Sequence, residues 1–276
     1  MLAIEKHIEL LQKALSVNKR FLGMYKSANA GHVGCSLSCA EILTYVEFGW
    51  KKEQDEIILS KGHAAASLYS VLAEAGKIEE SEIATFYKNN TYLAAHPPTN
   101  KLNGIPFATG SLGHGLSLAA GLGLAAKLKN NGKQIFCVTS DGEINEGSTW
   151  EAALFIAHHK LTNVIWLVDR NRLQGFGRTE DVMQLDPLDK KFEAFGFDVI
   201  MINGHDFQEF HEAKERSREN TRPTAIICNT VKGNNWITYE NKVDSHYLPM
   251  KEEYELVMKE VDNFYCQQCD LIEKGK

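Results

Sequence analysis

The chain has 276 residues, 43% of them hydrophobic, and its 30 basic and 36 acidic residues leave a net charge of −6. A chain of this length can bury one large core, and its mixed charges do not favour a nucleic acid or an anionic membrane as partner. No apolar run approaches the roughly twenty residues that a membrane span needs, and the charged start is unlike a secretory signal, so we expect a cytoplasmic protein.

Helical spacing dominates the first half of the chain. It predicts a long helix over residues 1–25 and a second helix to Phe48, with Ser38 as its N-cap and Glu41 completing a capping box. A strand at 57–59, a helix at 64–75, a helical stretch at 81–88 and an irregular segment at 91–110 follow.

Strands and helices alternate regularly in the second half. Strands are expected at 134–140, 163–169, 197–203 and 224–231, and helices at 113–130, 147–160, 188–195 and 206–219. This order predicts an α/β fold, a parallel sheet with helices on both faces. A polar loop over 232–249 precedes a final helix at about 251–272. No linker interrupts the pattern, so residues 1–276 should form a single domain.

The cysteines fit reduced thiols better than a disulfide framework. Four of the six lie in apolar or helical settings, and Cys266 and Cys269 form a single Cys-x-x-Cys pair near the C-terminus. One such pair without nearby histidines is weak support for a zinc or redox site, so surface thiols are the favoured interpretation.

Two of the predicted strands are followed by oxygen-bearing side chains. Asp141 follows the strand at 134–140, and Asn171 follows the strand at 163–169. The carboxyl ends of parallel strands joined by a crossover helix share one edge of a sheet, so these two side chains should meet. Mg²⁺ takes a few protein oxygens and completes its shell with phosphate and water. The pair therefore predicts Mg²⁺ bound to a diphosphate, and the alternative is an ordinary βαβ unit whose turn uses Asp-Gly.

Histidines lie beside glycine or proline in four loops: Gly31-His32, Gly62-His63, His96-Pro97 and Gly113-His114-Gly115. Glycines let backbone amides approach a ligand closely, and a helix N-terminus favours anionic oxygen. A single histidine is more often a structural hydrogen-bonding residue than a catalytic one. Five histidines in such loops, counting His246, indicate a ligand site.

Seven motifs carry a resemblance to a known family. They are Asn29-Ala30-Gly31-His32, Leu59-Ser60-Lys61-Gly62-His63, Thr109 to Gly115, Asp141 to Gly147, Asp169-x-Asn171, Phe192 to Gly196 and Asn203-Gly204-His205-Asp206. In this order, they resemble the N-terminal, thiamine diphosphate-binding part of transketolase. The resemblance extends from about residue 8 to residue 250, and it implies the thiamine diphosphate-binding fold.

The resemblance implies thiamine diphosphate and Mg²⁺ as cofactors. The implied metal ligands are the side chains of Asp141 and Asn171 and the carbonyl of Leu173. The implied cofactor-binding residues are His63, Gly113, His114, Gly115, Asp141, Gly142, Glu143, Asn171 and His246. The implied catalytic residues are His32, His96 and His246.

Some features depart from the family pattern or lie outside it. Val33 stands where the family usually has proline, and Tyr247 where glycine usually follows the last histidine. Glu146 and Glu151 are implied to lie toward a subunit interface, although Glu151 is equally interpretable as a solvated helix residue. Arg178 could reach a substrate anion, but a solvated loop arginine is the more common case.

The chain is short for the family that it resembles. Transketolases are normally more than twice as long, and their second module binds the aminopyrimidine ring and supplies an activating glutamate. We therefore expect the N-terminal subunit of a split transketolase, which joins a partner subunit carrying the pyrimidine module in a two-plus-two heterotetramer. Together they would transfer a two-carbon ketol unit from a ketose or ketose phosphate donor to an aldose acceptor.

Two alternatives remain open. One is a component of a thiamine diphosphate-dependent 2-oxo acid decarboxylase or synthase, although a sugar donor suits His32 and His96 better. The other is a non-catalytic regulatory subunit that has kept the fold.

Overall fold

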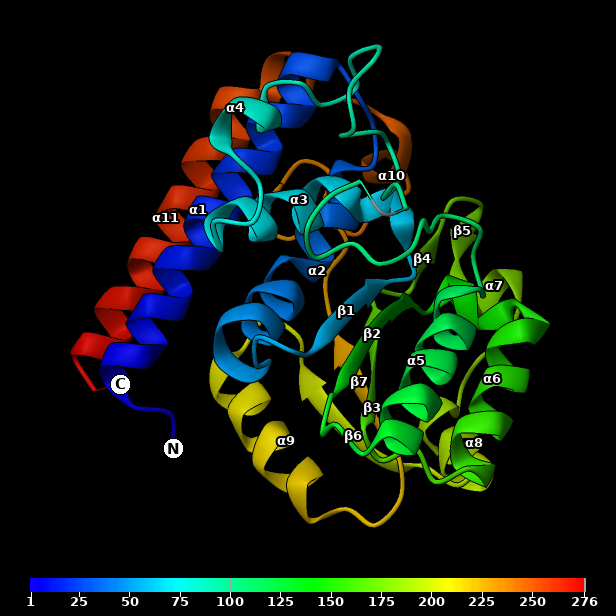
Figure 1. Cartoon of the computed structure of the whole chain (residues 1–276). Coiled ribbons are helices and arrows are strands. Elements are labelled where there is room, and N and C mark those ends of the chain that lie inside the picture. Colours follow the sequence, from blue (N-terminus) through cyan, green and yellow to red (C-terminus); the bar gives the residue numbers. More distant parts are fainter. Residues whose placement is uncertain (100, 276) are drawn as a thin grey trace.

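The computed structural model describes residues 1–99 and 101–275. A parallel sheet with the strand order β1-β2-β3-β7-β6 lies at its centre (Figure 1). Its strands are β1 (Glu56–Leu59), β2 (Ile135–Ser140), β3 (Val164–Arg170), β7 (Thr224–Asn229) and β6 (Asp198–Asn203). All neighbouring pairs run parallel, which confirms the predicted sheet.

The central strands β2 and β3 end level with each other. Every residue of both strands is buried, as expected where helices cover both faces of a parallel sheet. Ile135 pairs with Val164 at one end and Ser140 with Asp169 at the other. Residues that follow the two strands therefore start from the same carboxyl edge.

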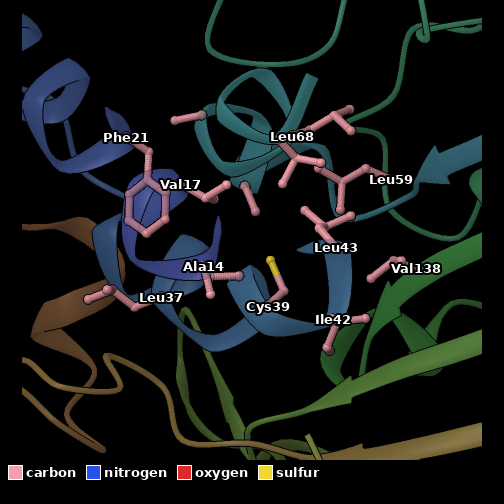
Figure 2. Packing of buried hydrophobic residues seen from close by; sticks show 14 of the residues in the cluster. Ala14, Val17, Phe21, Leu37, Cys39, Ile42, Leu43, Leu59, Leu68 and Val138 are labelled. Carbon is pink, nitrogen blue, oxygen red and sulfur yellow. The ribbon is translucent and has the colours of Figure 1, made fainter. Parts of the chain in front are cut away.

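The larger helical layer covers one face of the sheet. It consists of α1 (Ile4–Ala28), α2 (Val33–Tyr45) with its π-helical extension η1 (Val46–Trp50), α3 (Ala65–Glu74), α9 (Phe207–Glu219) and α11 (Tyr254–Glu273). The first and last helices, α1 and α11, lie side by side along one flank of the molecule (Figure 1). Figure 2 shows the core of this layer, where Val17 and Phe21 of α1 gather with Leu37 of α2, Leu68 of α3 and Val138 of β2.

A second core fills the opposite face. It lies beneath α5 (Gly115–Lys129), α6 (Gly147–His158) and α8 (Leu188–Phe195). Successive strand residues divide between the two cores, as in β2, where Phe136 and Val138 join the first and Cys137 joins the second. Helices thus cover both faces, as predicted.

Short elements surround the carboxyl edge or connect the layers. They are the turns η2 (Gly62–Ala64), η3 (Gly142–Asn145) and η4 (Lys251–Glu253), the short helices α4 (Glu80–Ile83), α7 (Thr179–Val182) and α10 (Asp244–Tyr247), and the hairpin β4 (Leu173–Gln174) and β5 (Gly177–Arg178). Within the described ranges, no helix is long and apolar enough to cross a membrane.

Three local predictions are wrong. Ser38 lies inside α2 and is not its N-cap, because α2 already begins at Val33 and the Ser38 hydroxyl binds the Asp169 carboxylate (2.6 Å). The helix predicted over 81–88 is only the single turn α4, which ends at Ile83. The loop predicted over 232–249 contains α10, which carries His246.

Candidate functional site

A cavity of about 420 Å³ lies at the carboxyl edge of the sheet. Its walls come from the start of α2, the turn after β1, the loop before α5, the turns after β2 and β3, and the segment from β7 to α10. Segments far apart in the sequence thus meet at one place. Residues from the predicted site that line the cavity are His32, His63, Gly142, Asn171, Leu173 and His246.

Asp141 is the first residue after β2 and is almost fully buried. One carboxylate oxygen accepts the N–H of Gly142 (2.8 Å), and the other accepts the N–H of Arg172 (2.6 Å) and the hydroxyl of Thr179 (3.2 Å). The backbone N–H of Asp141 donates to the carbonyl of Asp169 (3.1 Å). Asp141 is therefore held between the ends of β2 and β3, where the sequence placed it.

The other two predicted metal ligands lie on the turn after β3. The side-chain oxygen of Asn171 accepts the N–H of Leu173 (3.1 Å), and its amide nitrogen donates to Asp169 (3.3 Å). The N–H of the intervening Arg172 binds Asp141, so this turn wraps around the Asp141 carboxylate. All three predicted ligands thus belong to one local arrangement.

The chemistry of this arrangement fits a cation. Burial, and then the negative charge of Asp169, raises the pKa of Asp141 to about 6. Asp169 is paired with Lys61, but Asp141 has no ion-pair partner in the part of the chain that the structure describes. A buried carboxylate without a positive partner is costly. One carboxylate, one amide oxygen and one carbonyl are a donor set that suits Mg²⁺ together with phosphate and water.

The same cavity also fits an anion. Lys232 is buried, and its Nζ reaches the carbonyl of Leu173 (3.1 Å) and Nδ1 of His246 (2.8 Å). Among the described residues it has no carboxylate partner, and one of its three N–H donors is still available. Two more cavity residues, Asn145 and Gln174, have a buried amide nitrogen with no hydrogen-bond partner in the described structure. Such donors suit the oxygens of a diphosphate.

Three imidazole rings meet at this cavity. The ring centroid of His32 lies 5.2 Å from that of His246 and 5.5 Å from that of His63, and the centroids of His63 and His246 are 5.6 Å apart. His96 is more exposed, 6.5 Å from His32. Four of the five predicted histidines, all except His114, therefore lie close together, and the role of each stays a prediction.

Burial favours the neutral form of three of these histidines. Burial, and then the nearby charge of His246, lowers the pKa of His32 to about 4. Burial also lowers the pKa of His63 to about 4, and burial followed by the charge of Lys232 lowers that of His246 to about 3. Neutral imidazoles can donate and accept hydrogen bonds at the same time, which suits groups that hold or move a proton.

Close backbone contacts fix the first and last histidine loops. His32 has a left-handed backbone (φ 69°), and its N–H donates to the carbonyl of His246 (2.9 Å). A Cβ atom on Gly34 would lie 2.3 Å from Oγ of Ser245, so only glycine allows α2 to start this close to α10. Contacts across more than two hundred residues of sequence therefore determine where α2 begins.

The other predicted residues do not line the cavity; they are His96, Gly113, His114, Gly115, Asp141 and Glu143. Glu143 is fully buried, and its carboxylate accepts the N–H of Gly113 (2.8 Å), the N–H of Ser140 (3.3 Å) and the hydroxyl of Ser60. It therefore supports the loop before α5 from below. His114 is exposed at the N-terminus of α5, whereas its neighbours Gly113 and Gly115 are buried.

Sequence reasoning missed Lys61, Lys232, Asn145 and Gln174. Lys61 is fully buried, pairs with Asp169 and donates to the carbonyl of Cys35 (2.9 Å). A signal for both lysines was present at the edge where Asp141 was expected. Lys232 directly follows the strand predicted at 224–231, Lys61 comes two residues after the strand predicted at 57–59, and each stands beside a glycine. Because lysine side chains are usually exposed to solvent, the sequence alone does not indicate that these two are buried.

The remaining candidates lie apart from the cavity or on its border. Glu146 is exposed and lines the cavity, whereas Glu151 is exposed on α6. Arg178 is exposed and borders a neighbouring cavity of about 440 Å³. Cys266 and Cys269 are free thiols near the surface of α11.

Comparison with known proteins decides the family. Residues 12–267 match the family model described as "Transketolase, thiamine diphosphate binding domain". The chain belongs to this family. It is 39% identical over 264 residues to an apulose-4-phosphate transketolase subunit of Actinobacillus succinogenes, and the match covers 92% of this chain and 96% of that protein. It is 35% identical over 260 residues to 6-deoxy-6-sulfo-D-fructose transketolase subunit SqwG of a Clostridium strain, covering 90% and 94%.

Longer transketolases match only in part. The crystal structure of Campylobacter jejuni transketolase superposes with a TM-score of 0.83 at 29% identity, over 96% of this chain and 43% of that chain. Human transketolase is 35% identical over 247 residues, which is 85% of this chain and 39% of that protein. The predicted transketolase family and thiamine diphosphate-binding fold are confirmed. The Actinobacillus and Clostridium proteins, which are matched over nearly their whole length, are named as subunits, in agreement with the predicted N-terminal subunit of a split transketolase.

Proposed function

We propose that this chain is the N-terminal subunit of a split thiamine diphosphate-dependent transketolase. With a partner subunit it transfers a two-carbon ketol unit from a ketose or ketose phosphate to an aldose. The observation that carries this proposal is a pair of buried charges, Asp141 and Lys232, that lack partners of opposite charge among the residues that the structure describes. Lys232 lines the cavity, and Asp141 lies between the lining residues Ser140 and Gly142. A metal-bound diphosphate would neutralise both.

The residues around these charges would divide the binding task. Asp141, Asn171 and the carbonyl of Leu173 would hold Mg²⁺. Lys232, with the unpartnered amides of Asn145 and Gln174, would donate to the diphosphate oxygens. Gly142 lies beside Gln174 at the start of η3, where a side chain would approach the Gln174 side chain to 2.8 Å, so glycine keeps this wall open.

The histidines would act on the sugar. Bound here, thiamine diphosphate supplies the carbanion chemistry that breaks and re-forms the sugar bond between C2 and C3. His32 and His96 would hydrogen-bond the hydroxyl groups of the sugar and exchange protons with them. His63 and His246, stacked at the cavity wall, would hold the oxygens of the cofactor and substrate.

The partner would carry the pyrimidine module and its activating glutamate. Support comes from the names of the relatives, which are called subunits and match this chain over 94% to 96% of their length. We further propose that two copies of this chain and two copies of the partner form a heterotetramer. The names of the relatives mention apulose-4-phosphate and 6-deoxy-6-sulfo-D-fructose, so ketoses with an anionic end are the first donors to assay.

The test compares the chain alone with the chain co-expressed with a transketolase pyrimidine-module chain of the same genome. Each preparation receives thiamine diphosphate, Mg²⁺, a ketose phosphate donor and an aldose acceptor. We expect ketol transfer only from the pair. Full activity of the chain alone would contradict the split enzyme. Turnover of pyruvate in place of the ketose would favour the 2-oxo acid alternative, and failure of the pair to bind thiamine diphosphate would favour a regulatory subunit.

A further inference from the structure

Lys232 and His246 form a contact that cofactor binding alone does not require. Nζ of Lys232 lies 2.8 Å from Nδ1 of His246 and 3.1 Å from the carbonyl oxygen of Leu173. Both residues line the cavity, and Lys232 is almost fully buried. The contact therefore lies in the wall of the site, and its lysine side is shielded from bulk solvent.

The chemistry of the two groups gives this contact one direction. An ammonium group has three N–H donors and no acceptor, so Nδ1 must accept the hydrogen bond and cannot carry a proton. A neutral imidazole that accepts at Nδ1 carries its proton on Nε2. The opposite tautomer would bring two N–H donors together at 2.8 Å.

Cys35 offers the only competing partner for Nδ1 in the described part of the chain. Its Sγ lies 3.6 Å from Nδ1, and Cys35 is fully buried beneath the ring. A thiol can donate weakly to Nδ1, which agrees with the same tautomer. Burial opposes ionisation of this thiol, but the charges of Lys232, His63 and Lys61 lower its pKa to about 6. A thiolate would be stabilised by these same groups, so it would not require a proton on Nδ1. Nδ1 lies closer to Nζ of Lys232 (2.8 Å) than to Sγ of Cys35 (3.6 Å), so the ammonium group is the stronger influence on the tautomer of His246.

The other ring nitrogen lies among residues that line the cavity. A Cβ atom built on Gly175 would lie 3.6 Å from Nε2 of His246 and 2.0 Å from the hydroxyl oxygen of Tyr247, and all three residues line the cavity. A proton on Nε2 would therefore be presented to whatever oxygen occupies this part of the site. Phosphate, hydroxyl and carbonyl oxygens can all accept it.

We propose that Lys232 is a positioning residue that fixes His246 as the Nε2–H tautomer, so that His246 acts as a hydrogen-bond donor toward a ligand oxygen in the cavity. This proposal deepens the proposed function and rests on it for the identity of the ligand. The third N–H of Lys232 stays available for an anion, so one side chain would serve both tasks. The ammonium group of Lys232 would thus provide the positive charge for the anion and also determine the tautomer of His246.

The first test observes the tautomer directly. The full chain is labelled with ¹⁵N at histidine, and the two ring nitrogens of His246 are identified by the loss of their signals in His246→Asn. We expect the proton on Nε2 and an Nδ1 signal typical of a hydrogen-bond acceptor. Lys232→Met should move the Nδ1 signal toward that of a nitrogen without a hydrogen bond, and Lys232→Arg should restore it. A proton on Nδ1 of the unmodified chain would overturn the proposal, whether or not any variant folds.

The second test uses the assembled enzyme at saturating thiamine diphosphate and Mg²⁺. We expect Lys232→Met to lower kcat/KM for the ketose about tenfold, the effect of losing one well-placed hydrogen bond, and Lys232→Arg to recover part of it. Lys214→Met is the matched control, because Lys214 donates to the carbonyl of Gly49 (2.6 Å) away from the cavity. An unchanged kcat/KM in Lys232→Met would contradict the positioning role. An assembled enzyme without ketol transfer would refute the proposed function. The NMR test of the His246 tautomer does not depend on activity, so its result would remain valid.

Discussion

Asp141 is buried without a positive partner, so replacing it should separate cofactor binding from folding. Asp141→Ala removes the carboxylate that would bind Mg²⁺ and also removes a buried negative charge next to Asp169. We expect the variant to stay folded and to lose Mg²⁺-dependent binding of thiamine diphosphate, measured by calorimetry on the assembled enzyme. Asp181→Ala, at an exposed position on α7, should bind normally. An unchanged affinity in Asp141→Ala would contradict the metal assignment.

Lys61, in contrast to Asp141, is a buried charge with an ion-pair partner, Asp169. Lys61→Met would leave the carboxylate of Asp169 uncompensated at the end of β3. We expect the free energy of unfolding to fall by about 3–5 kcal/mol, as measured by urea denaturation. The double variant Lys61→Met, Asp169→Asn should recover part of the loss, because the unpaired charge is then gone. If the free energy of unfolding fell equally in the single and the double variant, the unpaired charge of Asp169 would not be the cause of the destabilisation.

At the level of single residues, the sequence located the acidic and aromatic members of the site but not the basic ones. Asp141, Asn171, His32 and His63 follow strands or glycines within the ordered motifs that carry the family resemblance. Lys61 and Lys232 stand in similar places, but a lysine pattern does not distinguish a buried ammonium from a solvated one. Only the three-dimensional contacts with Asp169, Leu173 and His246 make that distinction.

Within α5, two glycines that are close in sequence have opposite surroundings. Gly121 is exposed with no neighbour near a Cβ atom, whereas a Cβ atom on Gly123 would lie 2.3 Å from Cγ2 of Val164 on β3. Gly121→Ala should stabilise the chain by about 0.5–1 kcal/mol through helix propensity. Gly123→Ala should destabilise it by about 1–3 kcal/mol through overpacking. Thermal unfolding of the two variants checks this, and shifts of the same sign would contradict the packing described for α5.

The boundaries of elements were predicted well where local signals decide them. Asn29 ends α1 and Gly76 follows α3, both with positive φ, close to the predicted ends. The start of α2 was missed because a distant residue decides it, through the bond from His32 to the carbonyl of His246. Ser38 and Glu41 resemble a capping box, yet both are buried and bind partners on other elements. A local pattern cannot reveal such contacts.

For the whole molecule, α6 presents two adjacent exposed apolar side chains, which make it a candidate surface for the proposed self-association. Leu154 is 56% exposed and Phe155 is 39% exposed on this helix. We expect light scattering to show a multiple of the chain mass of 30.9 kDa for the chain and a single copy for Leu154→Glu, because a charge there cannot be buried between two copies. Leu128→Glu, on the exposed end of α5, is the matched control and should leave the mass unchanged. A mass that is the same in all three proteins would contradict an interface at α6.

The bond between the His32 N–H and the His246 carbonyl also has a consequence for biosynthesis. A ribosome releases the amino-terminal histidine loop long before α10, and domains acquire their contacts as the chain emerges. The sheet strands can pair once β7 has appeared, but His32 can take up its left-handed backbone against α10 only near the end of translation. We therefore expect a chain that stops before Asp244 to lack the contact that holds His32, and with it part of the cavity wall.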